Sequence, residues 1–295
     1  MRKVLLASTA LFALGSVSAM AADISISGST ELVLDMGDSA TADDSAFAVE
    51  HDIAITFSNT TDSGISMSMT YGMDDGGAAD DLETTISGDF GEIRYTQAAD
   101  EHALNDVDIE AGATAEEVFT RTTAAGLDSI GGIGNNHMTY VLPSVVDGLY
   151  VAASAANDAT TGEQSSYAVR YNAGPLTAVY GQLKGHVVSV THVGVSATFG
   201  DIGLQVAQNT DDTANLDNKS VNIGLTYTMG DITLGYESET AEDGVTANND
   251  EKHTAVGATY TIAPGLSASL TMAESDVLTT GTDTATTSIG LNVSF

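Results

Sequence analysis

The 295-residue chain contains no cysteine and no tryptophan, only three prolines, and only eight lysines and arginines against 41 aspartates and glutamates. Without cysteine, no disulfide framework can hold the fold together. The formal net charge of −33 argues against nucleic acid as a partner, because phosphates are bound by lysine and arginine, and it favours cations. Beyond the N-terminal segment no run reaches the roughly 18 to 20 consecutive apolar residues of a transmembrane helix. If this chain crosses a membrane, it must therefore cross with strands.

The first 21 residues have the layout of a cleaved secretory signal peptide. Arg2 and Lys3 precede an apolar stretch from Val4 to about Val17, and a small-residue cleavage site, Ala-Met-Ala, ends at Ala21. A membrane anchor is the alternative, but the apolar stretch is too short to span a bilayer. We expect residues 1–21 to be removed and residues 22–295 to form a single domain.

Apolar and polar side chains alternate along segments of about ten residues, the period of a β-strand whose two faces differ. In residues 65–71, for example, every second side chain is large and apolar, and the others are serine or threonine. Sixteen strands are expected, near residues 23–35, 47–59, 65–73, 81–89, 91–97, 135–142, 149–157, 165–172, 175–184, 187–199, 201–209, 218–229, 231–239, 251–262, 266–275 and 284–295. The valines of segment 187–199 do not keep one phase, so fourteen strands are the alternative.

The connections between these segments alternate in length. Seven are short turns rich in Gly, Asp and Pro, at 60–64, 88–92, 143–148, 172–175, 199–201, 229–231 and 263–265, and longer acidic loops lie between them. All three prolines fall in short turns, where no ladder N–H is needed. Short turns at one end and long loops at the other are typical of a transmembrane antiparallel β-barrel. We therefore predict an all-β barrel with short periplasmic turns and long extracellular loops.

The last eight residues, 288–295, alternate cleanly and stop at Phe295, which looks like the signal for outer-membrane assembly. Together with the signal peptide, the strand count and the Ile-Ser-Gly-Ser opening at 26–29, the chain resembles the general porins of Gram-negative bacteria, particularly the alphaproteobacterial branch. The resemblance implies an outer-membrane homotrimer of water-filled barrels that passes small hydrophilic solutes. It also implies that the third long loop folds inward to narrow each pore, although the enteric Pro-Glu-Phe-Gly-Gly motif of that loop is missing.

The third long connection, residues 98–134, is the longest and strongly acidic. Its acids are Asp100, Glu101, Asp106, Asp108, Glu110, Glu116, Glu117 and Asp128, against the single base Arg121. If the loop folds inward it lines the constriction with carboxylates; a solvated outer loop is the alternative.

The resemblance also implies basic side chains on the opposite wall, for which Arg94 and Arg170 are the candidates because both lie on the polar phase of their strands. So few bases against eight acids predict cation selectivity. The acidity is alternatively an adaptation to salty water.

No residue pattern points to catalysis, so we expect no enzyme activity. The six histidines are scattered without metal-ligand spacing, and acidic pairs such as Asp211 and Asp212 do not complete a calcium loop. No cofactor is expected, with calcium at the acidic loops left open. Aromatic residues for a lipid-facing girdle are few, 10 tyrosines and 7 phenylalanines, so a secreted acidic β-rich surface or adhesion protein without channel activity is the competing hypothesis.

Overall fold

The computed structural model describes residues 23–39, 42–74, 79–98, 101–109, 132–133, 136–158, 162–185, 189–212, 218–242, 244, 250–277 and 282–295. Sixteen strands lie in this described part: β1 (Asp23–Ser39), β2 (Ala42–Thr60), β3 (Ser66–Met73), β4 (Ala79–Gly88), β5 (Gly91–Thr96), β6 (His137–Val141), β7 (Leu149–Asp158), β8 (Gly162–Ala173), β9 (Leu176–Lys184), β10 (Ser189–Phe199), β11 (Ile202–Asp211), β12 (Asn218–Met229), β13 (Ile232–Glu242), β14 (Glu251–Ala263), β15 (Leu266–Val277) and β16 (Thr282–Ser294). One short 3₁₀ turn, η1 (Asn105–Val107), lies between β5 and β6.

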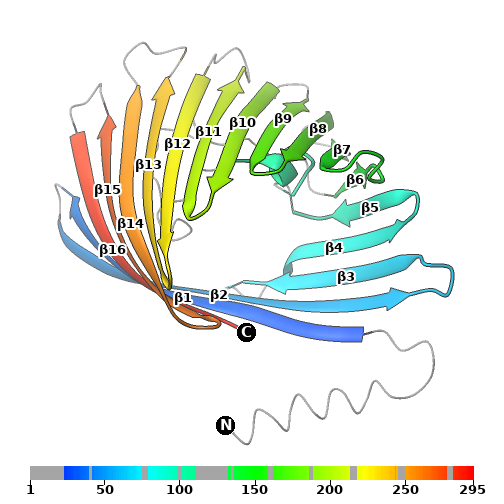
Figure 1. Ribbon diagram of the computed structural model, residues 1–295, viewed down its shortest axis with the longest axis horizontal. Helices are drawn as coiled ribbons and strands as arrows, with labels where there is room; N and C mark the ends of the chain where they lie inside the picture. The colour runs from blue at the N-terminus through cyan, green and yellow to red at the C-terminus, as the bar shows by residue number, and fades with distance from the viewer. Residues whose placement is uncertain are drawn as a thin grey trace, which may run out of the picture.

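Each strand pairs antiparallel with the next, and β1 also pairs with β16, so the sheet closes into a barrel. Figure 1 shows this closed arrangement as one continuous ring of arrows. The closing seam runs from Ser29 opposite Ser294 to Gly37 opposite Thr286. The prediction of sixteen strands is confirmed, and the alternative of fourteen is wrong. In the described ranges no helix has both the length and the apolar character needed to span a membrane.

The strands differ from their predicted bounds mainly at the first hairpin. β1 and β2 pair without interruption as far as Ser39 opposite Ala42, where the sequence pattern predicts a loop. The apolar alternation ends earlier than the hydrogen-bonded ladder, because a ladder needs backbone groups and not apolar side chains. The segment with the ambiguous phase is indeed strand β10, and Val190 interrupts the phase because it is buried on the inner face of the barrel.

Each of the seven predicted short turns contains a glycine with positive φ, for example Gly200 (φ 61°) and Gly230 (φ 60°). Such a backbone conformation carries little penalty only for glycine, which has no Cβ. The prolines Pro143, Pro175 and Pro264 lie in connections between strands, as predicted. The turn chemistry read from the sequence therefore fixes one end of the barrel.

The two faces of the sheet have different chemistry. The outer phase carries many large apolar side chains that remain exposed, such as Ile223, Leu225 and Tyr227 of β12, which are 41 to 47% exposed. Directly paired residues of neighbouring strands point to the same face, which allows the inner face to be followed around the ring. It passes from Arg94 through Thr85, Ser68 and Ser58 to Asp23 of β1. An apolar exterior and a polar interior are what a barrel in a lipid bilayer requires.

Candidate functional site: the inward segment and the barrel wall

Residues 101–109 leave the strand ladder and lie inside the ring, against β6 to β10. Figure 1 shows η1, the short turn within this segment, on the inner side of the ring beside β8 and β9. The wall holds the segment by hydrogen bonds to its backbone: His137 Nε2 donates to the Glu101 carbonyl at 2.8 Å, and the Ala103 N–H donates to Ser154 Oγ at 2.8 Å. Part of the longest connection is thus fixed inside the barrel.

An apolar contact supports these hydrogen bonds. Ala103, Leu104 and Val107 of the segment are essentially fully buried. The wall beneath Leu104 has no side chain in the way, since a Cβ placed on Gly181 of β9 would overlap with Leu104 Cδ1. The other wall residues of this cluster are small or aliphatic: Ala152, Ala156, Ala168, Val179, Leu183 and Val190. The main buried apolar cluster in the described part of the chain is therefore the seat of the inward segment.

Asp106, at the centre of η1, collects the polar contacts of the segment. Its carboxylate forms an ion pair with the Arg94 guanidinium of β5 and accepts a hydrogen bond from the Tyr150 hydroxyl of β7 at 2.5 Å. Its backbone carbonyl accepts a hydrogen bond from Arg170 Nη1 of β8 at 3.0 Å, and the Arg170 guanidinium stacks over the Tyr150 ring, 4.8 Å from its centroid. Three strands thus converge on one residue of the segment.

The end of the segment is held by a histidine. His192 of β10 is fully buried; its Nε2 accepts a hydrogen bond from the Ile109 N–H at 3.2 Å, and its Nδ1 lies 2.6 Å from Asn209 Oδ1 and 3.4 Å from Asp108 Oδ1. An Nε2 that accepts leaves the proton on Nδ1, from which it is donated to Asn209 Oδ1. His192 therefore holds the backbone of Ile109 and lies beside Asp108.

The opposite side of the ring is acidic. β16 is eight strands away from β8 in both directions, so the segment faces β16 and its neighbours across the barrel. The inner faces of β1, β2, β13 and β14 carry the carboxylates Asp23, Glu31, Asp35, Glu50, Asp52, Glu237, Glu239 and Glu251. Of the lysines and arginines that the structure describes, Arg94 and Arg170 alone lie on the inner face, while Lys184, Lys219 and Lys252 occupy the outer phase.

The structure thus places the sequence-predicted residues as follows. Glu101, Asp106 and Asp108 belong to the segment inside the ring, whereas Asp100, Glu110, Glu116, Glu117, Asp128 and Arg121 lie outside the described residues. Arg94 and Arg170, the candidates for a basic wall opposite the loop, both contact Asp106 and lie on the wall beneath the segment. A pattern of alternation places a residue on a face but does not say which strands lie across the barrel.

Sequence reasoning did not identify four residues that hold the segment: His137, Tyr150, Gly181 and His192. Tyr150 was detectable, because it is an aromatic residue on the polar phase of β7, which leaves it inside the barrel. The two histidines also lie on inner phases of their strands. Nothing in the sequence marks Gly181, whose role depends on where Leu104 lies.

Phe295 lies at the closing seam, where the last strand meets the first. Its backbone exchanges two hydrogen bonds with Gly28, at 3.0 and 3.1 Å, and its ring lies over Gly28, with a Cβ on that glycine only 3.0 Å from Phe295 Cζ. The side chain is 75% exposed. The terminal aromatic residue therefore completes the ladder of the seam and presents its ring outside.

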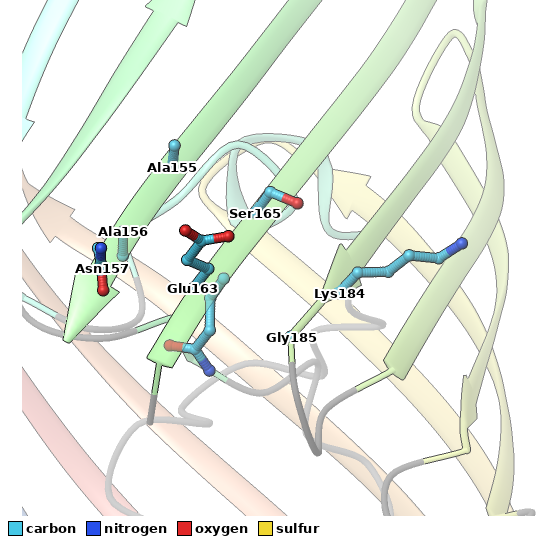
Figure 2. Close-up of a pocket in the computed structure, with 8 residues that line it drawn as sticks. Ala155, Ala156, Asn157, Glu163, Ser165, Lys184 and Gly185 are labelled. Atoms are coloured by element: carbon cyan, nitrogen blue, oxygen red, sulfur yellow. The ribbon is translucent and has the colours of Figure 1, made fainter. Parts of the chain in front are cut away.

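A cleft opens at the rim, at the end of β7, β8 and β9. Figure 2 shows its lining, in which Asn157, Glu163 and Ser165 project from neighbouring strands and the Lys184 side chain extends away from the Glu163 carboxylate. The cleft lies at the strand ends, away from Asp106. Among the described residues, no group of three or more His, Asp or Glu side chains is arranged to hold a metal ion, at the rim or elsewhere.

A closed sixteen-stranded antiparallel barrel with an apolar exterior, a polar interior and a chain segment fixed inside it defines the class of outer-membrane channel proteins. A sequence model of the Gram-negative porin family matches residues 7–293, and the chain belongs to this family. The family and the barrel place the protein in the outer membrane of a Gram-negative bacterium.

Solved structures agree with this fold. OmpT of Vibrio cholerae in its trimer form is 16% identical, with a TM-score of 0.71 over 93% of this chain and 99% of that chain. A variant of Rh. blastica porin is 14% identical, with a TM-score of 0.70 over 92% and 100% of the two chains. Another porin structure, refined at 1.8 Å, is 17% identical, with a TM-score of 0.66 over 92% and 100%. A search of curated proteins finds no match.

Proposed function

We propose that this porin is a homotrimeric, cation-selective diffusion channel for small hydrophilic solutes, with residues 98–134 as its constriction loop. The observation that carries the proposal is the fixing of residues 101–109 inside the barrel by Asp106 and two wall histidines. A segment held there reduces the free cross-section and leaves a lumen lined by polar side chains. No catalytic step is part of this function.

Cation selectivity follows from the inner-face charges. The described inner face carries two arginines, both in contact with Asp106, and many carboxylates on the strands across the ring. Rings of Asp and Glu favour cations in a pore because of the field they create. The remaining acids of the loop, Asp100, Glu110, Glu116, Glu117 and Asp128, add to this charge if they also face the lumen, and Arg121 subtracts from it.

The trimer and the export signal complete the proposal. The trimer is supported by the family and by the trimer form of the Vibrio cholerae relative, and the exposed apolar exterior provides surface for both subunit contacts and lipid. Residues 1–21 act as the cleaved signal, so the mature chain begins at Ala22.

Detergent-purified protein added to a planar lipid bilayer tests the channel. We expect conductance to rise in groups of three equal steps. We also expect lipid vesicles reconstituted with the purified protein to swell in solutions of small neutral sugars. Folded protein that gives neither conductance nor swelling would refute the channel and favour the adhesion hypothesis. The mass of the mature chain, measured on protein from the outer membrane, checks cleavage before Ala22.

A further inference from the structure

Both arginines of the described inner face are committed to the inward segment. Arg94 and Asp106 form an ion pair whose side chains are only 15% and 18% exposed, and Glu92 Oε1 lies 3.3 Å from Arg94 Nε. Arg170 donates to the Asp106 carbonyl and stacks on Tyr150, which itself donates to the Asp106 carboxylate. None of these contacts requires a solute in the pore.

This arrangement has two physical consequences. Removing one partner of a partly buried ion pair destabilises the contact, because the other charge is left without its counter-ion. Adjacent charges of opposite sign also cancel at distances beyond their separation, so Arg94 contributes little positive potential while Asp106 is ionised beside it. A field directed across the pore requires positive charge on one wall and negative charge on the other. Here the described wall across from the segment is acidic, and the wall beneath the segment has its positive charge cancelled by Asp106.

We propose that Asp106 is a positioning residue that fixes the constriction segment through Arg94, Tyr150 and Arg170 and, by the same contacts, cancels the positive charge of the wall. The proposal rests on the channel function proposed above and refines it. The pore then has no basic half, and its width and its selectivity depend on the same carboxylate for different reasons.

Two measurements separate the role of Asp106 in pore width from its role in selectivity. Pore width is measured as the size of the largest neutral polyethylene glycol that lowers single-channel conductance, and selectivity as the zero-current potential in a salt gradient. The variants are Asp106→Asn, Arg94→Gln and the double variant. Glu274→Gln is the matched control, because it makes the same acid-to-amide type of change on the outer phase of β15.

We expect Asp106→Asn and Arg94→Gln each to shift the polymer cut-off to larger sizes, and the double variant to shift it no further, since the two side chains act as one contact. Asp106→Asn also lowers the cation-to-anion permeability ratio, by about twofold at low salt, because it removes one carboxylate and leaves Glu92 as the acidic neighbour that still faces Arg94. Adding Arg94→Gln restores that ratio but not the cut-off. Glu274→Gln changes neither quantity.

A cut-off in Asp106→Asn equal to that of the parent protein overturns the proposal, as do additive shifts in the double variant. If Asp106→Asn does not assemble, Tyr150→Phe removes one hydroxyl from the same contact, and an unchanged cut-off in that variant overturns the proposal as well. Failure of the proposed function is distinguishable, because the parent protein itself would then give no conductance.

Discussion

The contact between Leu104 and Gly181 makes the sharpest prediction about how the segment is held. Leu104 is fully buried, and replacing a buried leucine by alanine costs about 2 to 5 kcal/mol. A loss of about 3 kcal/mol lowers the equilibrium constant for docking of the segment by more than 100-fold. We therefore expect Leu104→Ala to reduce the stability of the folded protein and to widen the pore, while the strands keep their pairing.

Gly181→Ala perturbs the same contact from the wall. Its Cβ would overlap with Leu104 Cδ1, and forcing an extra methyl group into a packed site costs about 1 to 3 kcal/mol. In the double variant, the methyl group introduced at position 181 meets no leucine and fills part of the space that Leu104 has left. The double variant should therefore lose clearly less free energy than the two single variants lose together.

The losses of the two single variants and the double variant are measured as the free energy of unfolding in lipid vesicles. Urea titration unfolds the protein, and electrophoretic mobility reports the folded barrel. Gly37→Ala is the control for the loss of a strand glycine, because the nearest atom to a Cβ at that position is 3.8 Å away. Losses that simply add in the double variant would refute the inference that Leu104 and Gly181 touch.

Three further outcomes follow from the barrel and its charge. Gly28→Ala should lower the free energy of unfolding more than Gly37→Ala does, because its Cβ would lie 2.7 Å from the Asp52 carbonyl at the closing seam; equal losses would contradict this, again by urea titration. Leu225→Arg, on the outer face, should cost about 2 to 4 kcal/mol in the same assay, whereas Thr226→Arg, on the inner face, should cost much less. If both cost the same, the assignment of faces is wrong. Raising the salt from 0.1 to 1 M shortens the Debye length from about 10 to about 3 Å and should weaken the selectivity measured as a zero-current potential, and a selectivity independent of salt would rule out control by exposed charges.

The barrel was largely predictable from the sequence because its determinants are local. Alternation of side chains in each segment, positive-φ glycines such as Gly200 in the short turns and proline in three connections all act within a few residues. The ends of β1 and β2 were not predictable, because their ladder continues past the apolar band as far as Ser39 opposite Ala42.

The candidate site was predictable only in part, because its geometry depends on distant parts of the chain. The polar phase of Arg94 and Arg170 indicated that both point inward, but their partner Asp106 is determined by where η1 packs. The apolar side chain of Val190 on the inner face of β10 could not be explained from its own strand, since Val190 belongs to the seat of the inward segment. Long-range packing, rather than side-chain period, decides which wall each charge belongs to.

Cation selectivity of the pore can be measured as the zero-current potential of single channels in a planar bilayer. Concentrated potassium chloride is placed on one side of the bilayer and dilute potassium chloride on the other. We expect the dilute side to become positive, because cations cross the acidic pore more readily than chloride. A potential near zero, or a dilute side that becomes negative, would contradict the acidic, cation-selective pore while leaving the barrel intact.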